Sequence, residues 1–358
     1  MISIGKRKIG AGNPAYIIAE VGSNFDGSLR RAKALAKLAK KCGADAYKIQ
    51  NFRAREIVSA AGFKNLKVAF QSKWKKPVVD VYKAAEFPRG WLRELSDHCR
   101  EIDIDFFSSP YDTEAVDLLE SIHVPAHKIG SGEIDNLDFL RYIARTKKPI
   151  ILGCGAATMG EIDAAVRAIR GEGNKEIVLL QCVTNYPSPM KDANLKAMVA
   201  LKERFGVEVG YSDHTTGLRQ GGDDPLWGLT VPLCSVALGG LVVEKHFTDD
   251  RKRSGPDHPF AMEPREFTLL IEGIRALERA LGDGKKKVEP SEKETVIIQR
   301  RGIYTVSHIP KGAVVTKNML QLLRPAAGLR PAALSSVLGR KTRRALKAGE
   351  PLFKHDII

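Results

Sequence analysis

Two histidines, each placed directly after a short apolar run, are the residues in this sequence best suited to chemistry. Residues 207–211 lead into Ser212-Asp213-His214, and residues 240–245 lead into His246. Polar residues that follow the strands of a β/α barrel meet at one mouth, where such folds carry their active sites. Either histidine alone would more often be structural. Two imidazoles at equivalent strand ends, followed by the Asp257 carboxylate, predict a divalent-metal site with positions open for substrate.

Two lysines are expected at the same mouth. Lys48 lies in the second apolar run, and Lys128 lies in the fourth. The runs also deliver a set of polar side chains, namely Glu20, Gln50, Ser109, Tyr111, Ser131, Glu133, Thr184 and Tyr186. Ammonium groups beside hydroxyls and glycine-flanked amides predict a cradle for phosphate and carboxylate groups. A lysine there could instead form a Schiff base in an apolar pocket, or lie on the surface, but the predicted metal site favours anion binding.

The elements that must position these residues are alternating strands and helices. Eight apolar runs are typical of strands, at residues 16–20, 44–49, 105–108, 126–129, 149–152, 177–180, 207–210 and 241–245. Helical patterns lie between them, beginning with a helix that Ser28 caps and ending with one over residues 264–281. Eight such units over roughly 270 residues predict a (β/α)8 TIM barrel. A doubly wound sheet is disfavoured because no G-x-G-x-x-G follows the first strand.

The composition changes after residue 282. Residues 1–283 are expected to form the barrel, and the polar, charged residues 284–299 a linker. Residues 300–358 are expected to form a small β-rich domain with a faint internal repeat, in which Ile309-Pro310-Lys311-Gly312 resembles Leu346-Lys347-Ala348-Gly349. A domain of this size has only marginal stability by itself, so we expect it to pack against a larger domain or subunit.

The charge of the chain is concentrated at its C-terminal end. The formal net charge is +15, and residues 300–358 hold twelve Lys and Arg against two acidic residues. Such a field attracts anions. We expect no nucleic-acid partner, because this region has no recognisable binding motif and only Tyr304 and Phe353 as aromatic residues.

Cysteine usage and hydropathy bear on location. The five cysteines have no regular spacing, which favours reduced thiols and a cytoplasmic protein. The N-terminal residues lack the apolar core of a signal peptide. The most apolar stretch, residues 228–243, contains Pro232 and is too short to span a bilayer. We therefore expect no association with a membrane.

The motifs together resemble the sialic acid synthase family, which includes N-acetylneuraminate, legionaminate and pseudaminate synthases. The resemblance covers nearly the whole chain and is carried, in order, by residues 18–22 (IAEVG), 44–50 (ADAYKIQ), 107–110 (FSSP), 128–133 (KIGSGE), 210–215 (GYSDHT), 244–247 (EKHF) and 255–258 (GPDH). Residues 300–358 resemble the antifreeze-like (SAF) domain of that family. The implied fold is a barrel that condenses phosphoenolpyruvate, followed by a SAF domain.

The resemblance implies a reaction and a role for each residue. Phosphoenolpyruvate would condense with an open-chain N-acetylated aminosugar to give a nine-carbon 2-keto acid and phosphate. His214 and His246 match histidines that hold a divalent metal, typically Mn²⁺, with Mg²⁺ or Co²⁺ able to serve. Lys48 and Lys128 match lysines that bind phosphoenolpyruvate, with hydrogen bonds from residues matching Gln50, Ser109, Ser131 and Ser212. Residues matching Glu20 and Asp257 contact the sugar hydroxyls and can move protons, and those matching Tyr111, Glu133, Thr184 and Tyr186 line the same pocket.

The resemblance also implies an assembly. In this family the SAF domain of one subunit covers the barrel mouth of its partner in a domain-swapped homodimer. An arginine from that domain reaches the N-acyl group of the sugar, and Arg324 stands at the matching position. A basic lid over a site that handles two anions is electrostatically favourable, although Arg324 could also be one of twelve surface cations.

Several departures from the family pattern are expected to cluster around the sugar pocket, and so to affect the acceptor more than the reaction. Phe25 replaces a histidine, Gly153-Cys154 replaces Ser-Thr, Thr184 replaces an asparagine or serine, residues 326–328 lack the usual glycine-asparagine pair, and Arg219–Cys234 forms an unusually long segment. The acceptor is therefore of the N-acetylmannosamine type or of a legionaminate or pseudaminate type. A catalytically silent sugar- or anion-binding protein is the alternative from another class. An ice-binding role for the C-terminal domain is disfavoured, because its dense positive charge is unlike a flat, ordered ice-facing surface.

Overall fold

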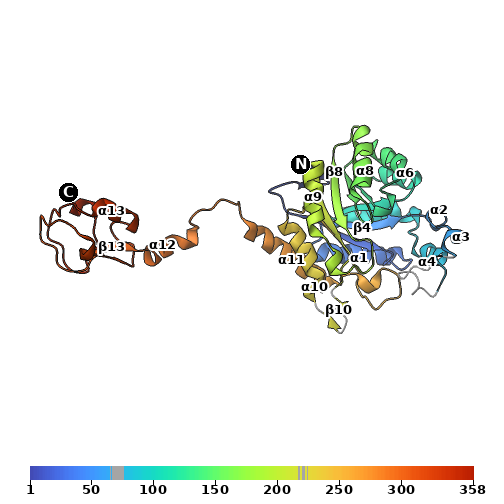
Figure 1. Ribbon diagram of the computed structural model, residues 1–358. Coiled ribbons are helices and arrows are strands. Elements are labelled where there is room, and N and C mark those ends of the chain that lie inside the picture. The colour runs from blue at the N-terminus through green and yellow to red at the C-terminus, as the bar shows by residue number, and fades with distance from the viewer. Residues whose placement is uncertain (65, 67–75, 217, 220–221, 224) are drawn as a thin grey trace. The chain divides into compact units, whose positions relative to one another are not determined.

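Eight parallel strands form the centre of the computed structural model, which describes residues 1–358 apart from 65, 67–75, 217, 220–221 and 224 (Figure 1). They are β3 (Tyr16–Gly22), β4 (Ala46–Asn51), β5 (Asp105–Pro110), β6 (His127–Ile129), β7 (Ile150–Gly153), β8 (Ile177–Cys182), β9 (Glu208–Asp213) and β12 (Val242–His246). Their hydrogen-bonded order is β5-β4-β3-β12-β9-β8-β7-β6. The first and last of these strands, β3 and β12, pair with each other, and the two edge strands, β5 and β6, lie in contact without a hydrogen-bonded ladder, so the strands close nearly to a barrel. The expected (β/α)8 fold is confirmed.

Helices cover the outside of this barrel (Figure 1). They are α1 (Leu29–Cys42), α5 (Leu92–Glu101), α6 (Thr113–Ser121), α7 (Leu137–Ala144), α8 (Met159–Gly171), α9 (Leu195–Phe205), α10 (Pro225–Ala237) and α11 (Pro264–Leu281). The Ser28 hydroxyl accepts a hydrogen bond from the Arg31 amide and so caps α1, as expected. Every residue of β3 is buried, because a parallel strand packs on both faces.

Two insertions were not anticipated from the sequence. The first eleven residues include a hairpin, β1 (Ile2–Ile4) and β2 (Arg7–Ile9), whose isoleucines join the barrel core. Between β4 and α5 the residues that the structure describes include three short α-helices, α2 (Ala54–Ile57), α3 (Ala60–Phe63) and α4 (Val78–Ala85). Strands of three residues and helices of four to eight residues give too weak a periodicity for detection in a sequence.

Part of the long segment Arg219–Cys234 lies outside the described residues. The part that is described contributes to β10 (Leu218–Arg219), β11 (Gly222–Asp223) and α10. No helix among the described residues has both the length and the apolar character needed to cross a membrane.

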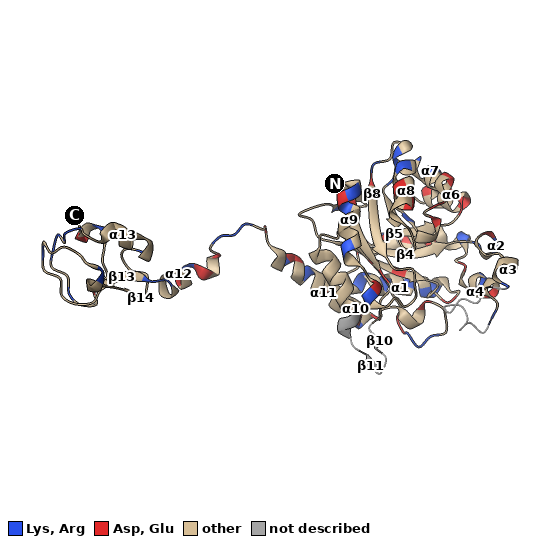
Figure 2. Cartoon of the chain, in the orientation of Figure 1, with Lys and Arg blue, Asp and Glu red and all other residues tan. Residues whose placement is uncertain are grey.

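The chain separates by packing into two units, Met1–Gly282 and Asp283–Ile358. The second unit contains α12 (Lys293–Gln299), β13 (Gly302–Thr305), β14 (Leu320–Leu323) and α13 (Leu334–Val337), with Lys and Arg spread along it (Figure 2). Its own core includes Ile303, Val315, Val337 and Leu352. Ile309 and Leu346, the equivalent residues of the faint repeat, exchange two backbone hydrogen bonds of 2.9 Å. The two half-units therefore pair with each other. Residues 293–299, expected within a linker, are helical.

A buried carboxylate ties the amino-terminal ends of the barrel strands together. Asp45, which precedes β4, accepts hydrogen bonds from the Ile17 amide at 2.9 Å, from Arg7 at 2.5 Å and from Arg275 at 3.2 Å. These groups come from β3, β2 and α11. One side chain thus fixes three elements at the end of the barrel opposite the carboxyl ends of its strands.

We expect Asp45→Asn to lower the free energy of unfolding by about 2 kcal/mol, because it leaves two arginines without their shared carboxylate. Both arginines keep contact with solvent, which limits the loss. Urea unfolding followed by circular dichroism measures the change. Asp163→Asn, at an ion pair with the exposed Arg167 on α8, is the control and should change stability by less than about 0.5 kcal/mol. Equal losses in the two variants would contradict this account of Asp45.

Candidate active site

A cavity of about 360 Å³ opens at the carboxyl ends of the barrel strands. Of the fifteen residues expected in the site, all but Arg324 line it: Glu20, Lys48, Gln50, Ser109, Tyr111, Lys128, Ser131, Glu133, Thr184, Tyr186, Ser212, His214, His246 and Asp257. Arg324 lies in the second unit, where it is exposed next to β14. Strand ends thus bring together residues that are up to 237 positions apart, from Glu20 to Asp257.

Four buried charges occupy the floor of the cavity. The Lys48 ammonium lies 2.5 Å from a Glu20 oxygen and 3.6 Å from Glu244, and Lys128 lies 3.4 Å from the same Glu244 oxygen. Lys48 also donates a hydrogen bond to Ser109, and Gln50 donates one of 2.8 Å to Glu20. Each cation therefore has a carboxylate partner, so the two charge pairs balance.

The pKa values of the two carboxyl groups diverge. Burial raises the pKa of Glu20, and the nearby Lys48 only partly opposes it. Burial acts in the same direction on Glu244, but Lys128 and Lys48 together outweigh it and hold the pKa of Glu244 below its usual value. Glu20 is consequently the carboxylate of this cluster that more readily takes a proton.

Glu244 was missing from the predicted site although it contacts both lysines. It precedes His246 by two residues on β12, and alternate residues of a strand point to the same side. Ser212 stands in the same relation to His214 on β9, and its hydroxyl donates a hydrogen bond of 3.2 Å to Glu244. This two-residue spacing is the signal in the sequence that would have identified Glu244.

The two histidines lie side by side, with ring centroids 5.6 Å apart. Nδ1 of His214 is 2.7 Å from the carbonyl oxygen of Val183, which orients the ring. Burial lowers the pKa of His214 to about 4 and that of His246 well below its ordinary value, so both imidazoles are neutral at physiological pH. Nδ1 of His246 is buried without a hydrogen-bond partner among the described residues.

Neutral imidazoles with unused nitrogen atoms fit a divalent cation. Among the described residues, however, no three His, Cys, Asp or Glu side chains are grouped closely enough to hold a metal. Asp257, expected near the histidines, is held instead by Ser23, whose amide and hydroxyl donate to it at 2.9 and 2.8 Å. The described residues that could contribute to holding such an ion are therefore His214 and His246, which line the same cavity.

A buried ion pair supports the two histidines from behind. Lys245 and Asp213 directly precede His246 and His214, face each other in the strand register, and form an ion pair. Asp213 also accepts hydrogen bonds from the amide and hydroxyl of Thr215, at 3.0 and 2.9 Å. The ion pair therefore fixes the register of the two strand ends that carry the imidazoles.

Two departures from the family pattern have local explanations. A Cβ atom on Gly153 would lie 2.7 Å from the Ser131 hydroxyl, so this hydroxyl occupies the space beside the glycine. Ser131 accepts a hydrogen bond of 3.0 Å from the Gly155 amide there. Phe25 was expected near the sugar pocket, but it is fully buried and packs edge-on against Phe87 with ring centroids 5.1 Å apart. Its replacement of histidine therefore affects packing.

One wall of the cavity was not predicted at all. The described part of the segment between β4 and α5 contributes five lining residues that are mainly apolar, namely Phe52, Ile57, Val81, Tyr82 and Ala85. They lie on short helices and loops whose sequence carries no motif.

Tyr186, by contrast, was predicted, and its ring contacts those of His214 and Phe260 at centroid distances of 4.2 and 5.3 Å.

We expect Glu20→Gln to tighten the binding of inorganic phosphate about fivefold, by about 1 kcal/mol, because the neutral amide no longer competes for Lys48. Titration calorimetry measures this directly. Glu133→Gln is the control, since Glu133 lines the same cavity but accepts its hydrogen bond from Asn136. Weaker phosphate binding in Glu20→Gln than in the wild type would contradict the proposed competition.

Comparison with known proteins agrees with this architecture. Residues 35–286 match the NeuB family, and residues 300–358 match the SAF domain. The N,N'-diacetyllegionaminic acid synthase of Campylobacter jejuni is 38% identical over 93% of this chain and 97% of its own length. The pseudaminic acid synthase of Helicobacter pylori is 35% identical over 96% and 98%. The crystal structure of an N-acetylneuraminic acid synthetase from Leptospira borgpetersenii superposes with a TM-score of 0.71 at 32% identity, over 82% of this chain and 94% of that one. The chain therefore belongs to the NeuB family and is a phosphoenolpyruvate-dependent sugar-acid synthase that forms a carbon–carbon bond.

Proposed function

We propose that this enzyme condenses phosphoenolpyruvate with an open-chain N-acetylated aminosugar of the N-acetylmannosamine type. The products are a nine-carbon 2-keto sugar acid and phosphate. The observation that carries the proposal is the pairing of Lys48 and Lys128 with carboxylates and hydroxyls in the same cavity as two neutral histidines. The part of the cavity around the two lysines suits an anion, and the part around the two histidines suits a polar carbonyl compound.

Phosphoenolpyruvate is assigned to the two lysines. Its carboxylate and phosphate would replace the internal carboxylates as partners of Lys48 and Lys128, with hydrogen bonds from Ser109 and Ser131. Gln50 and Ser212, which donate to Glu20 and Glu244 respectively, would keep those carboxylates in place when the lysines change partner.

The bond changes follow from the chemistry of the two reactants. Carbon 3 of phosphoenolpyruvate attacks the aldehyde carbon, whose oxygen takes up a proton, and carbon 2 becomes oxocarbenium-like. Water adds to carbon 2 and loses one proton, which leaves a hydroxyl group there. The bond between carbon 2 and the phosphate oxygen then breaks, the hydroxyl proton passes to the departing phosphate, and the ketone remains. Glu20 and Asp257 are assigned to the proton transfers, since burial raises the pKa of each.

A divalent metal completes the proposal. His214 and His246 are the residues that would hold it, and Mn²⁺ is the expected ion, with Mg²⁺ or Co²⁺ able to serve. When bound, such an ion supplies a Lewis acid for the aldehyde oxygen. Tyr186 packs against His214, with ring centroids 4.2 Å apart, and would exclude water from that side of the imidazole.

A legionaminate- or pseudaminate-type acceptor is the second candidate, and the unpredicted wall favours it. Phe52, Ile57, Val81 and Ala85 suit methyl and acyl substituents better than a row of hydroxyl groups. Among the described lining residues, Lys48 and Lys128 are the only Lys or Arg, and both are assigned to phosphoenolpyruvate. Among the described residues of that wall, none supplies a further cation for an acceptor phosphorylated at carbon 6.

We also propose that the second unit covers the barrel mouth of a partner subunit in a domain-swapped homodimer. Arg324 is exposed on a turn that is fixed by two hydrogen bonds, from the Tyr304 hydroxyl to the Pro325 carbonyl and from the Ala326 amide to the Ile297 carbonyl, both 2.8 Å. A cation on so well anchored a turn suits contact with the acyl oxygen of the acceptor.

The reaction is tested by phosphate release from phosphoenolpyruvate with Mn²⁺. The acceptors are N-acetylmannosamine, its 6-phosphate, and 2,4-diacetamido hexoses. We expect turnover with an unphosphorylated acceptor and a loss of at least about a hundredfold in His246→Ala. Sugar binding without phosphate release from any acceptor would support the silent homologue instead.

The assembly is tested by complementation. Arg324→Ala and His246→Ala should each be poorly active, but coexpression should restore activity at about a quarter of the sites, because a mixed dimer contains one intact barrel covered by one intact SAF domain. Each variant expressed alone is the control. If activity is not restored although mixed dimers form, Arg324 acts on its own barrel or on none.

A further inference from the structure

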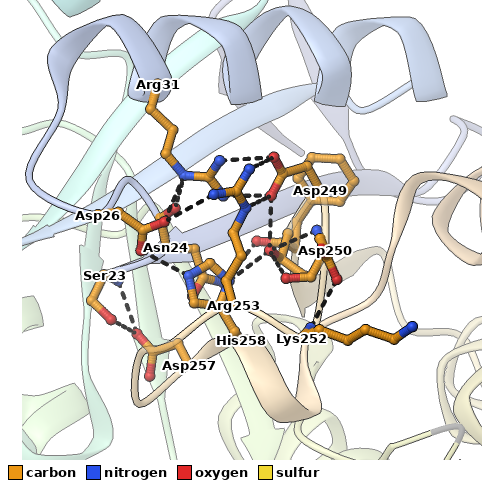
Figure 3. A network of polar contacts seen from close by, with 12 residues as sticks. Ser23, Asn24, Asp26, Arg31, Asp249, Asp250, Lys252, Arg253, Asp257 and His258 are labelled. Carbon is orange, nitrogen blue, oxygen red and sulfur yellow. Dashed lines mark hydrogen bonds and ion pairs between the residues drawn. The ribbon is translucent and has the colours of Figure 1, made fainter.

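Two loops that flank the cavity are joined by a dense set of charged contacts (Figure 3). One follows β3 and the other follows β12. Arg31 pairs with Asp26 at 3.0 Å and also with Asp249, and Arg253 pairs with Asp249 at 3.1 Å and with Asp26 at 3.8 Å. Two arginines therefore share the same two carboxylates, one from each loop.

His258 extends this network to the cavity. Its side chain is fully buried, with Nε2 2.8 Å from an Asp26 oxygen and Nδ1 2.7 Å from the Thr248 hydroxyl. Both ring nitrogens are therefore occupied. A Cβ atom at Gly255 would lie 2.8 Å from Cδ2 of His258, so the loop folds tightly over the ring. The imidazole cannot turn without breaking two contacts.

Asp257, the residue next to His258, is held from the other side by Ser23. One carboxylate oxygen, Oδ2, accepts hydrogen bonds from both the amide and the hydroxyl of Ser23. Gly22 has a φ of +54°, and a Cβ atom there would lie 2.4 Å from that same oxygen. Only glycine permits this approach, so the local backbone is built around the carboxylate.

We propose that Asp26, Arg31 and His258 form a positioning network for Asp257, which fixes the direction of its carboxylate toward the acceptor. None of the three is among the residues that line the described cavity, whereas Asp257 and Ser23 are. The network therefore acts through Asp257. The proposal rests on the proposed function in one respect, the contact between Asp257 and the acceptor sugar.

A double-mutant cycle of Asp26→Asn and Asp257→Asn tests the proposal. Asp26→Asn should raise the KM of the acceptor about tenfold and change the KM of phosphoenolpyruvate less than about twofold. In the Asp257→Asn background the same substitution should add no further effect, because both changes act on one group. Asp45→Asn is the matched control, since it removes a buried carboxylate shared by two arginines at the opposite end of the barrel.

Additive effects in the cycle, or equal rises in both KM values, would overturn the proposal. His258→Gln serves as a second variant if Asp26→Asn does not fold, with the same split expected. Hydrogen exchange supplies a readout that is independent of turnover: the Ser23 amide, which donates to Asp257, should exchange at least about tenfold faster in either variant than in the wild type or in Asp45→Asn. Unchanged exchange would also overturn the proposal. No turnover by the wild type would overturn the proposed function alone.

Discussion

The four buried charges of Glu20, Lys48, Glu244 and Lys128 are the interaction on which the rest of the site depends. Removing an ion from water costs several kcal/mol unless a partner is held at close range, so all four side chains must be kept in place together. They come from β3, β4, β12 and β6. A shift of one residue in any of these strands would turn its charged side chain away from the cavity and leave another buried charge unpaired. The pairing of these buried charges therefore requires the observed register of the barrel strands, and a change in one would disrupt the other.

Polar contacts outside the cavity maintain that register. The Asp213–Lys245 pair joins β9 to β12 behind the two histidines, and Asp45 joins β2, β3 and α11 at the amino-terminal ends of the strands. The Asp26 and His258 contacts add a third tie between the loops after β3 and β12. Side chains that face inward line the cavity, and charged partners behind or beside them determine where they point. This division follows from the two-residue alternation of strands.

Much of this arrangement could be predicted from the sequence, because a barrel places strand ends at one mouth, and Lys48, Lys128, His214 and His246 each lie near the end of an apolar run or follow it. The prediction was incomplete where the sequence has no clear hydrophobic periodicity or motif to mark an element or a site residue. Glu244 is hidden inside such a run, and the β1–β2 hairpin is too short to recognise. Phe25 was assigned to the sugar pocket although it packs in the core, because a substitution in a motif does not show which way the side chain points.

The contrast between regular strands and irregular segments also explains why the sequence indicates the type of reaction more clearly than it indicates the acceptor sugar. The residues assigned to phosphoenolpyruvate lie on or directly after strands, where hydrogen bonding and burial fix the backbone. The wall assigned to the acceptor comes from the segment between β4 and α5, whose short helices are set by local packing. Such segments can change without disturbing the barrel, and enzymes of this fold vary their substrates through them. The proposed function therefore ties the choice of acceptor to the segment that contributes Phe52, Ile57, Val81 and Ala85, and ties the carbon–carbon bond-forming step to residues at the strand ends.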